Sequence, residues 1–206
     1  MLQNMKVAGK LGLGFGLILL FIVGLGIMSL QRMSVVNEQS TILAQNWMPS
    51  IKVVEEINTN PSDLRLYEFE HVLTQTPQDM EKIENEMDSV LASMNKNRAT
   101  YEKLISSDEE KALYEDFSKK FDKYMDMHKK LIPVSKQNKT EEAQKILREA
   151  EVLFNDFSAE LIKIVELNVE GGNKASLLGD EIYAQARIVM ISVIIISILL
   201  GIAVAF

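Results

Sequence analysis

The chain of 206 residues has no cysteine and only two histidines. A disulfide framework is therefore excluded, and so is a zinc site built from cysteine and histidine ligands. With 4 prolines, 10 glycines and 7% aromatic residues, the chain is poor in the residues that a β-rich domain needs. These shortages favour an all-α domain of about 150 residues that is held together by packing alone.

Basic residues are fewer than acidic ones, 22 against 29, so the formal net charge is −7. A negative chain is not typical of proteins that bind nucleic acid or an anionic membrane surface, and we expect no nucleic acid among its partners. Catalytic signatures are missing too, since the sequence has no H-E-x-x-H, no G-x-S-x-G and no phosphate-binding P-loop. We predict that the chain is not an enzyme, with no catalytic residue, no metal and no cofactor.

Charge is absent altogether from two long segments, residues 11–30 and 188–206. A helix of about 20 apolar residues crosses the hydrocarbon core of a bilayer, so each segment is predicted to be a transmembrane helix in contact with membrane lipid. A cleaved signal peptide is the alternative for the first segment, because Lys6 and Lys10 precede it. Its apolar run is longer than a signal-peptide core, and no A-x-A-like cleavage site follows it.

The lysines before the first span also predict the topology. Positive charge next to a span stays on the cytoplasmic side, so residues 1–10 are expected in the cytoplasm. Residues 31–187 are then predicted to form an extracytoplasmic domain, and the second span returns the chain to the cytoplasm.

Apolar residues between the two spans recur at alternating intervals of three and four, as they do in helical bundles. We predict helices over about 30–74, 79–105 and 108–135, and a last helix that runs from Thr140 towards the second span. Because the turns between them are short, neighbouring helices must be antiparallel. The predicted fold is an up-down-up-down four-helix bundle, anchored in the membrane and flanked by two transmembrane helices.

Several residues are expected to begin or interrupt these helices. Thr76, Ser107 and Thr140 are the predicted N-caps. Pro61 is expected to kink the first helix, or alternatively to start a new one, and Gly171-Gly172 is expected to interrupt the last helix. The predicted seam of the first helix comprises Met33, Ala44, Trp47, Ile51, Val54 and Asn58.

Polar residues that fall on apolar seams are the first candidates for a functional site: Asn58, Asn97, His128 and Asn168. Buried polar groups need partners, so these residues either specify the register of the bundle or line a polar pocket between helices. The acidic stretches at 81–86 and 108–110 are expected to lie on solvated helix faces and caps instead.

Each helical residue adds about 1.5 Å along the bundle, so the height of each candidate can be counted from the nearest predicted turn. Arg65, His128 and Arg148 fall close to one end of the bundle on three different helices, and Asn58 and Asn97 fall together further along. Because the arginine fork matches a carboxylate, we predict that a small organic anion is the ligand. The alternative is a structural ion pair between Arg65 and Glu68 or another acid of the bundle.

Three stretches carry a resemblance to a known family: KLGLGFGLILLFIVGLGIMSL, then NWMPSIKVVEEI with DLRLYEFEHVL, and SSDEEKALYEDF. They resemble the amino-terminal half of methyl-accepting chemotaxis receptors with a four-helix-bundle sensor domain. The resemblance implies a homodimer in the bacterial inner membrane that binds a small molecule outside the cell, and it carries Arg65 over as a ligand contact. It also implies a HAMP linker and a signalling domain that meets cytoplasmic chemotaxis proteins; both are absent here and are expected after Phe206 in a longer protein.

Two other functions remain open at this point. Sensor histidine kinases and diguanylate cyclases contain similar modules, so the chain is alternatively the sensor half of one of these enzymes. The other alternative is a structural membrane-anchored bundle that binds no ligand.

Overall fold

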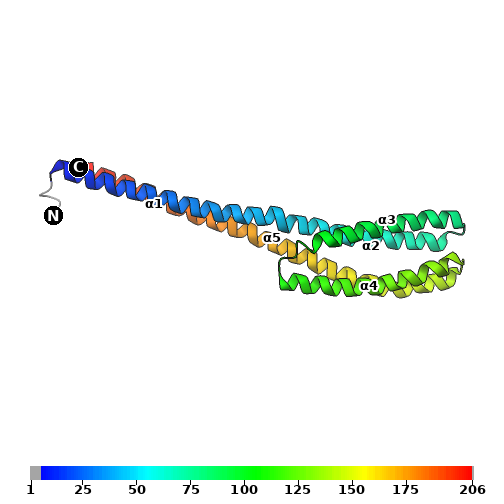
Figure 1. The fold of residues 1–206 in the computed structure, drawn as a ribbon. Coiled ribbons are helices and arrows are strands. Elements are labelled where there is room, and N and C mark those ends of the chain that lie inside the picture. Colours follow the sequence, from blue (N-terminus) through cyan, green and yellow to red (C-terminus); the bar gives the residue numbers. More distant parts are fainter. Residues whose placement is uncertain (1–5, 206) are drawn as a thin grey trace. The chain divides into compact units, whose positions relative to one another are not determined.

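The computed structural model describes residues 6–205, and these residues form helices joined by short turns (Figure 1). The all-α prediction is confirmed. Residues 1–5 of the predicted cytoplasmic segment, and Phe206 at the end of the second predicted span, lie outside the described residues. In order along the chain, the elements are α1 (Val7–Ile42), the π-helix η2 (Leu43–Trp47), α2 (Met48–Leu73), α3 (Pro77–Tyr101), α4 (Asp108–Lys136) and α5 (Thr140–Ala205).

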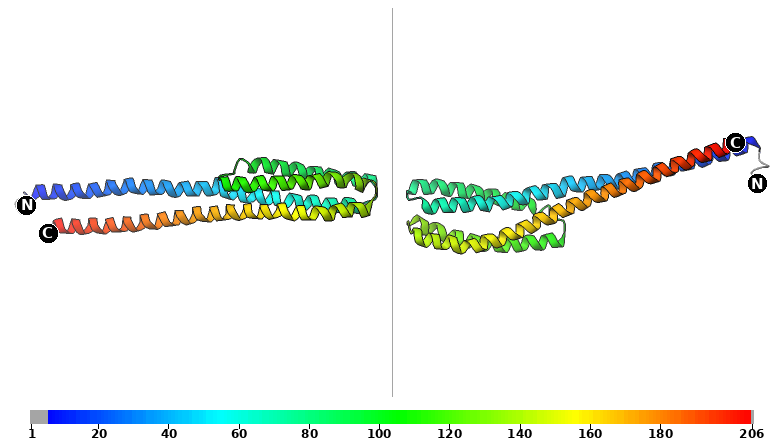
Figure 2. Two further views of the ribbon diagram at one scale, coloured as in Figure 1. Left: turned by 90° about the horizontal axis from the view of Figure 1, so that it is seen from below. Right: turned by 180° about the vertical axis from the view of Figure 1, so that it is seen from behind.

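The chain divides into two compact units, of which the first comprises residues 1–43 and 173–206. In this unit α1 and the C-terminal part of α5 run side by side, and residues of both helices line shared hollows (Figure 2). Both helices contain stretches that are long and apolar enough to cross a membrane, with mean hydropathies of 2.6 and 2.3. Their apolar side chains are exposed to the surroundings, as at Phe15, Leu20 and Ile188.

The second unit, Ala44–Gly172, is the four-helix bundle. The turns at 74–76 and 137–139 lie at one end of it, which we call the distal end (Figures 1 and 2). The turn at 102–107 lies at the opposite, proximal end. This alternation is the predicted up-down-up-down order.

The core of the bundle follows the predicted three-four spacing of apolar residues in α3, α4 and α5. Ring pairs such as Phe121 and Phe157, whose centroids are 5.5 Å apart, fill the middle of it. Burying aromatic side chains of this size stabilises each position by about 1.5–3 kcal/mol relative to exposure. The largest fully buried side chains are Tyr101, Tyr124, Phe117, Phe157, Ile57, Leu64, Met94, Leu131, Leu147, Leu161, Ile164 and His71.

Two of the three predicted N-caps are confirmed. The side-chain oxygens of Thr76 and Ser107 accept hydrogen bonds from the backbone N–H groups three residues later, at 3.4 and 3.1 Å. Thr140 is instead the first helical residue of α5, because the carbonyl of Lys139 accepts the first helical hydrogen bond. The preceding Asn138 has a φ of 53°, the left-handed conformation that ends α4, and asparagine tolerates it.

The predicted seam of the first bundle helix is only partly observed. Val54 is buried and Trp47, Ile51 and Asn58 are half-buried, but Ala44 is exposed and Met33 is 70% exposed. A single heptad phase cannot pass through Leu43–Trp47, because a π-helix adds one residue to the turn. The buried positions of α2 are Ser50, Val54, Ile57, Pro61, Leu64, Glu68, His71 and Val72.

Neither a new helix at Pro61 nor a break at Gly171-Gly172 is observed. Helix α2 continues through the buried Pro61, so Asn60 is not the cap of a new helix, and the kink at Pro61 stays a prediction. Helix α5 continues through Gly171 and Gly172. A side-chain carbon added at Gly171 would lie 2.5 Å from Cη2 of Trp47, so the glycine admits the indole ring rather than breaking the helix.

Candidate functional site

A cavity of ≈190 Å³ opens between α2 and α5 towards the distal end of the bundle. Arg65 and Arg148, two of the three residues predicted to gather at this end, both line it. Apolar and charged side chains alternate around the wall, which consists of Arg65, Phe69, Val72 and Leu73 from α2 and Gln144, Leu147, Arg148 and Glu151 from α5.

The side chain of Arg65 is only 12% exposed and is held from several sides. Its Nη2 donates to the backbone oxygen of Leu147 at 3.3 Å and lies 3.9 Å from Oε2 of Glu151. The guanidinium carbon lies 5.2 Å from the ring centroid of Phe69 and 5.3 Å from that of Phe154. Its Nη1 is buried and has no hydrogen-bond partner among the described residues. The guanidinium is thus held in place, and the ion pair with Glu151 at 3.9 Å is too long for a hydrogen bond.

One turn further along α2, Glu68 is a buried carboxylate with 1% exposure. The hydroxyl of Tyr124 donates to its Oε2 at 2.6 Å, and Nδ1 of His128 lies 2.7 Å from its Oε1. Both partners come from α4, so this cluster joins α2 to α4. His128, the third predicted distal residue, therefore belongs to the buried cluster and not to the wall of the cavity.

Arg65 lies between the cavity and this buried cluster. Burial raises the pKa of the Tyr124 hydroxyl, and the negative charge of Glu68 raises it further. The guanidinium of Arg65 is close enough to act on the same hydroxyl in the opposite direction. The alternative of an ion pair with an acid of the bundle is observed with Glu151, at 3.9 Å, and not with Glu68.

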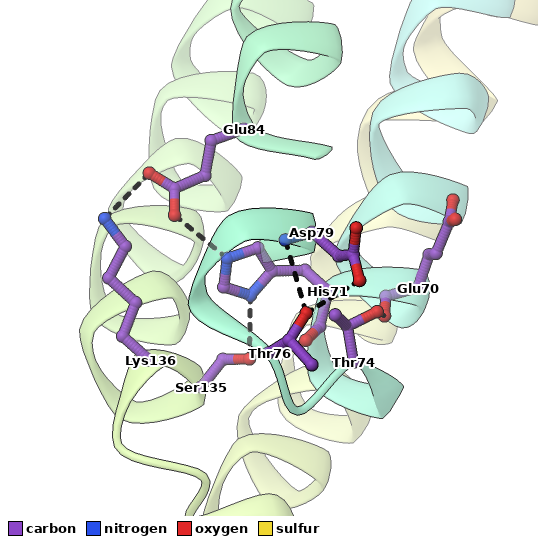
Figure 3. Close-up of polar contacts among 8 residues, drawn as sticks. All are labelled: Glu70, His71, Thr74, Thr76, Asp79, Glu84, Ser135 and Lys136. Carbon is purple, nitrogen blue, oxygen red and sulfur yellow. Dashed lines mark hydrogen bonds and ion pairs between the residues drawn. The ribbon is translucent and has the colours of Figure 1, made fainter. Parts of the chain in front are cut away.

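A second buried cluster surrounds His71, whose ring has no exposure to solvent (Figure 3). Its Nδ1 lies 2.8 Å from Oγ of Ser135 on α4, and its Nε2 lies 3.1 Å from Oε1 of Glu84 on α3. Nζ of Lys136 lies 2.7 Å from the other oxygen of Glu84. Burial alone would raise the pKa of Glu84, but the hydrogen bonds from Lys136 and His71 outweigh burial and hold that pKa below its ordinary value.

Serine, histidine and carboxylate stand here in the order of a hydrolase triad, but their burial prevents that chemistry. Ser135 is 2% exposed and His71 is 0% exposed, so a substrate carbonyl cannot reach the hydroxyl. Oγ of Ser135 also donates to the backbone oxygen of His71 at 3.1 Å. Because this uses its one hydrogen, Nδ1 of His71 is the donor in the bond between them. The cluster ties three helices together.

The proximal end of the bundle holds a third cluster, around Glu110. This residue was expected at a solvated helix start, and it is 0% exposed. Its Oε1 accepts from the hydroxyl of Tyr101 at 2.5 Å and from Nδ2 of Asn168 at 3.1 Å. Its Oε2 accepts from the backbone N–H of Ser106 at 2.8 Å. The carboxylate thus joins the α3–α4 turn to α5, and burial followed by the charge of Glu110 raises the pKa of Tyr101.

The remaining two predicted site residues are not brought together. Nδ2 of Asn97 donates to Oδ1 of Asn60 at 3.2 Å, and both line an open polar groove between α2 and α3. Asn58 does not line this groove. The amide pair joins the two helices of one hairpin, which fits register specification better than ligand binding.

The sequence reasoning missed His71 and Glu151, and it considered Glu68 only as a possible partner of Arg65. A signal for Glu68 was present, because Tyr124 and His128 lie on a predicted seam and their buried polar tips require a partner. No pattern marks Glu151, which is an exposed acid on a helix rich in acids. Within residues 6–205, no group of three or more histidine and acidic side chains is arranged to hold a metal ion.

Comparisons with known proteins agree with this architecture. A family model described as a four helix bundle sensory module for signal transduction matches residues 4–183. The chain is also 27% identical over 186 residues to the protein named "Putative sensory transducer protein YvaQ" of Bacillus subtilis (strain 168). The match covers 90% of this chain and 32% of that relative, so the chain spans about a third of the relative's length.

Proposed function

Because this chain belongs to the family of four-helix-bundle sensory modules for signal transduction, we propose that it is the sensor region of a membrane-anchored chemoreceptor. Its ligand is a small organic anion, which binds the cavity between α2 and α5. The observation that carries this proposal is the position of Arg65, which lines the cavity and acts on the buried Tyr124 of α4. A change at the cavity therefore reaches the packing between helices.

The proposed topology places the bundle outside the cell. The two apolar segments, 11–30 and 188–206, cross the inner membrane of a bacterium, and Lys6 and Lys10 keep the N-terminus in the cytoplasm. A signalling region that follows the second span in the whole protein then meets cytoplasmic chemotaxis proteins.

The proposed signal is a small displacement of α5 relative to α2. Arg65 is bonded to the backbone of α5 at Leu147, and a bound anion competes for the same guanidinium. The negative charge of the anion beside this guanidinium alters the electrostatic field at Tyr124 and Glu68, which join α2 to α4. Helix displacements of about 1–2 Å are typical of such switches. Helix α5 contains both a wall of the cavity and the second apolar segment, so it is the element that transmits the change.

We also propose that the receptor is a homodimer. Large apolar side chains are exposed on the bundle, including Leu66 (64%), Leu73 (70%) and Val152 (63%). They belong to α2 and α5, which also form the cavity. A second copy of the chain that packs against these two helices would bury them.

The natural absence of cysteine makes the topology straightforward to test. A single cysteine in place of the exposed Glu86 on α3 is expected to react with a membrane-impermeant maleimide in intact bacteria. A cysteine in place of Lys6 is expected to react only after the membrane is opened. The reverse pattern would invert the topology and remove the receptor function.

Signalling is tested by joining residues 1–206 to the signalling region of a characterised chemoreceptor and applying a panel of carboxylates and amino acids. We expect at least one carboxylate to change the output, and Arg65→Gln to abolish that response. Lys145→Gln, an exposed change of the same charge outside the cavity, should leave the response intact. Equal responses in the two variants would refute the role of the cavity.

A further inference from the structure

We propose that the cavity between α2 and α5 selects a monocarboxylate with an apolar body, and that Glu151 is the residue that excludes dicarboxylates. This inference rests on the proposed sensory function and names the ligand class of the same site. Three features of the cavity carry it: the balance of charge, the nature of the wall, and the position of Glu151 relative to Arg65.

The charged side chains that line the cavity can be neutralised by one negative charge on the ligand. Arg65 and Arg148 are positive and Glu151 is negative, so the wall has a net charge of one positive unit. A bound monocarboxylate neutralises this excess. A dicarboxylate would leave a second negative charge beside Glu151, where like charges repel.

The rest of the wall cannot compensate a second charge. Phe69, Val72, Leu73 and Leu147 present hydrocarbon to the cavity. Removing a carboxylate from water into such surroundings is costly unless it is paired, whereas an alkyl chain gains about 25 cal/mol per Å² of buried apolar surface. The wall therefore favours a ligand with one charged end and one apolar end.

Glu151 is placed to compete with a ligand for Arg65. Its Oε2 lies 3.9 Å from Nη2, a distance at which a charge is felt but no hydrogen bond is made. The Glu151 side chain is 60% exposed, whereas that of Arg65 is 12% exposed. The acid can consequently swing into water when a ligand arrives, while the guanidinium stays fixed between Phe69 and Phe154.

The rival arrangement is a dicarboxylate that bridges the two arginines, with one carboxylate on Arg65 and the other on Arg148. It predicts the opposite preference and a dependence on both arginines. In that case Glu151 would weaken the contacts of both arginines with the dicarboxylate. Its removal would tighten dicarboxylate binding, and the dicarboxylate would be the preferred ligand both before and after the change.

A matched set of five-carbon probes distinguishes these arrangements by calorimetry on the full chain in lipid nanodiscs. Valerate has one carboxylate, glutarate has a second carboxylate in place of the methyl group, and pentanamide has the same shape without charge. We expect the wild-type chain to bind valerate, to bind glutarate at least about tenfold more weakly, and not to bind pentanamide. Arg65→Gln should abolish valerate binding, with circular dichroism used to verify its helical fold.

Glu151→Gln is the decisive variant, because its exposed side chain can be changed without affecting the core. It should tighten valerate binding by about 1.5- to 5-fold, the range for an exposed charge pair. Glutarate binding should tighten by a larger factor, so the ratio of the valerate affinity to the glutarate affinity should fall. The control is Glu149→Gln, an acid of similar exposure on the same helix that does not line the cavity. It should leave both affinities unchanged.

Three results would overturn the inference: no Arg65-dependent binding of valerate, binding of glutarate at least as tight as that of valerate, or an unchanged preference in Glu151→Gln. Each of them concerns the ligand class alone. The proposed receptor function fails separately, on the maleimide labelling pattern or on the absence of any carboxylate response in the joined receptor.

Discussion

Replacing Gly171 by alanine tests how the start of the first bundle helix is fixed against the last helix. Trp47 is the only tryptophan of the chain, and it lies at the end of the π-helix before α2. A side-chain carbon at Gly171 would lie 2.5, 2.6 and 2.7 Å from Cη2, Cζ3 and Cζ2 of its ring. Carbon atoms in contact are normally about 3.5–4.0 Å apart, so the ring would have to withdraw by about 1 Å.

The expected cost is the difference between two opposing effects. Overpacking of this kind costs about 1–3 kcal/mol. Alanine in place of glycine inside a helix regains about 0.8–1.0 kcal/mol. The net loss for Gly171→Ala is therefore about 0–2 kcal/mol. Gly179 on the same helix has nothing within 4 Å of the added carbon, so Gly179→Ala should instead gain about 1 kcal/mol.

The difference between the two variants, about 1–3 kcal/mol, isolates the contact with Trp47. It can be measured by urea unfolding of the full chain in detergent, followed by circular dichroism. In a Trp47→Leu background the ring edge is gone, and Gly171→Ala should become as favourable as Gly179→Ala. If the two alanine variants are equally stable in the natural background, Gly171 is not a packing position and the reasoning is wrong.

Three further predictions concern the bundle. A hydrogen bond from Lys120 at 2.7 Å holds the pKa of Glu160 below its ordinary value of 4.5, so the resulting stability is present above that pH and is lost as the pH falls. Unfolding measured between pH 7 and pH 3 should therefore depend less on pH in Glu160→Gln, and an unchanged slope would contradict the ion pair. Tyr101→Phe removes the hydroxyl that donates to the buried Glu110 and should cost about 1–3 kcal/mol in urea unfolding; full stability would show that the carboxylate does not need it. Thr76→Ala should cost about 1 kcal/mol and Thr76→Ser much less, and equal stabilities would rule out the cap.

The fold could be predicted for three of the four bundle helices because their inward positions are apolar. Met94, Phe117 and Leu161 each stand in an uninterrupted three-four rhythm, and each is 0–1% exposed. The first bundle helix was harder to predict, because its predicted seam passed in one phase through the π-helix Leu43–Trp47 and because Glu68 and His71 occupy inward positions further along. In a single sequence, a charged residue counts against an inward position, and only the partner on another helix reverses that inference.

The candidate site was predicted in part for a similar reason. Counting the rise per residue from the turns brought Arg65 and Arg148 to the same end of the bundle, and they share one cavity. That count fixes the height of a residue along the bundle, but the direction of its side chain depends on the helical phase. His128 was placed at the right height, and its ring lies in the buried cluster instead of the cavity.

The distribution of polar residues supports the proposal that a ligand at the distal end acts on the whole bundle. The aromatic core around Phe157 supplies packing energy through ring contacts such as those with Phe121 and Tyr124. The buried carboxylates Glu68 and Glu110 are different, since each is satisfied in one register only and an unpaired buried charge is strongly destabilising. These polar layers therefore determine the register, and the distal one contains Glu68 one turn from Arg65. In the proposed mechanism, an anion bound beside Arg65 changes the electrostatic field at this layer.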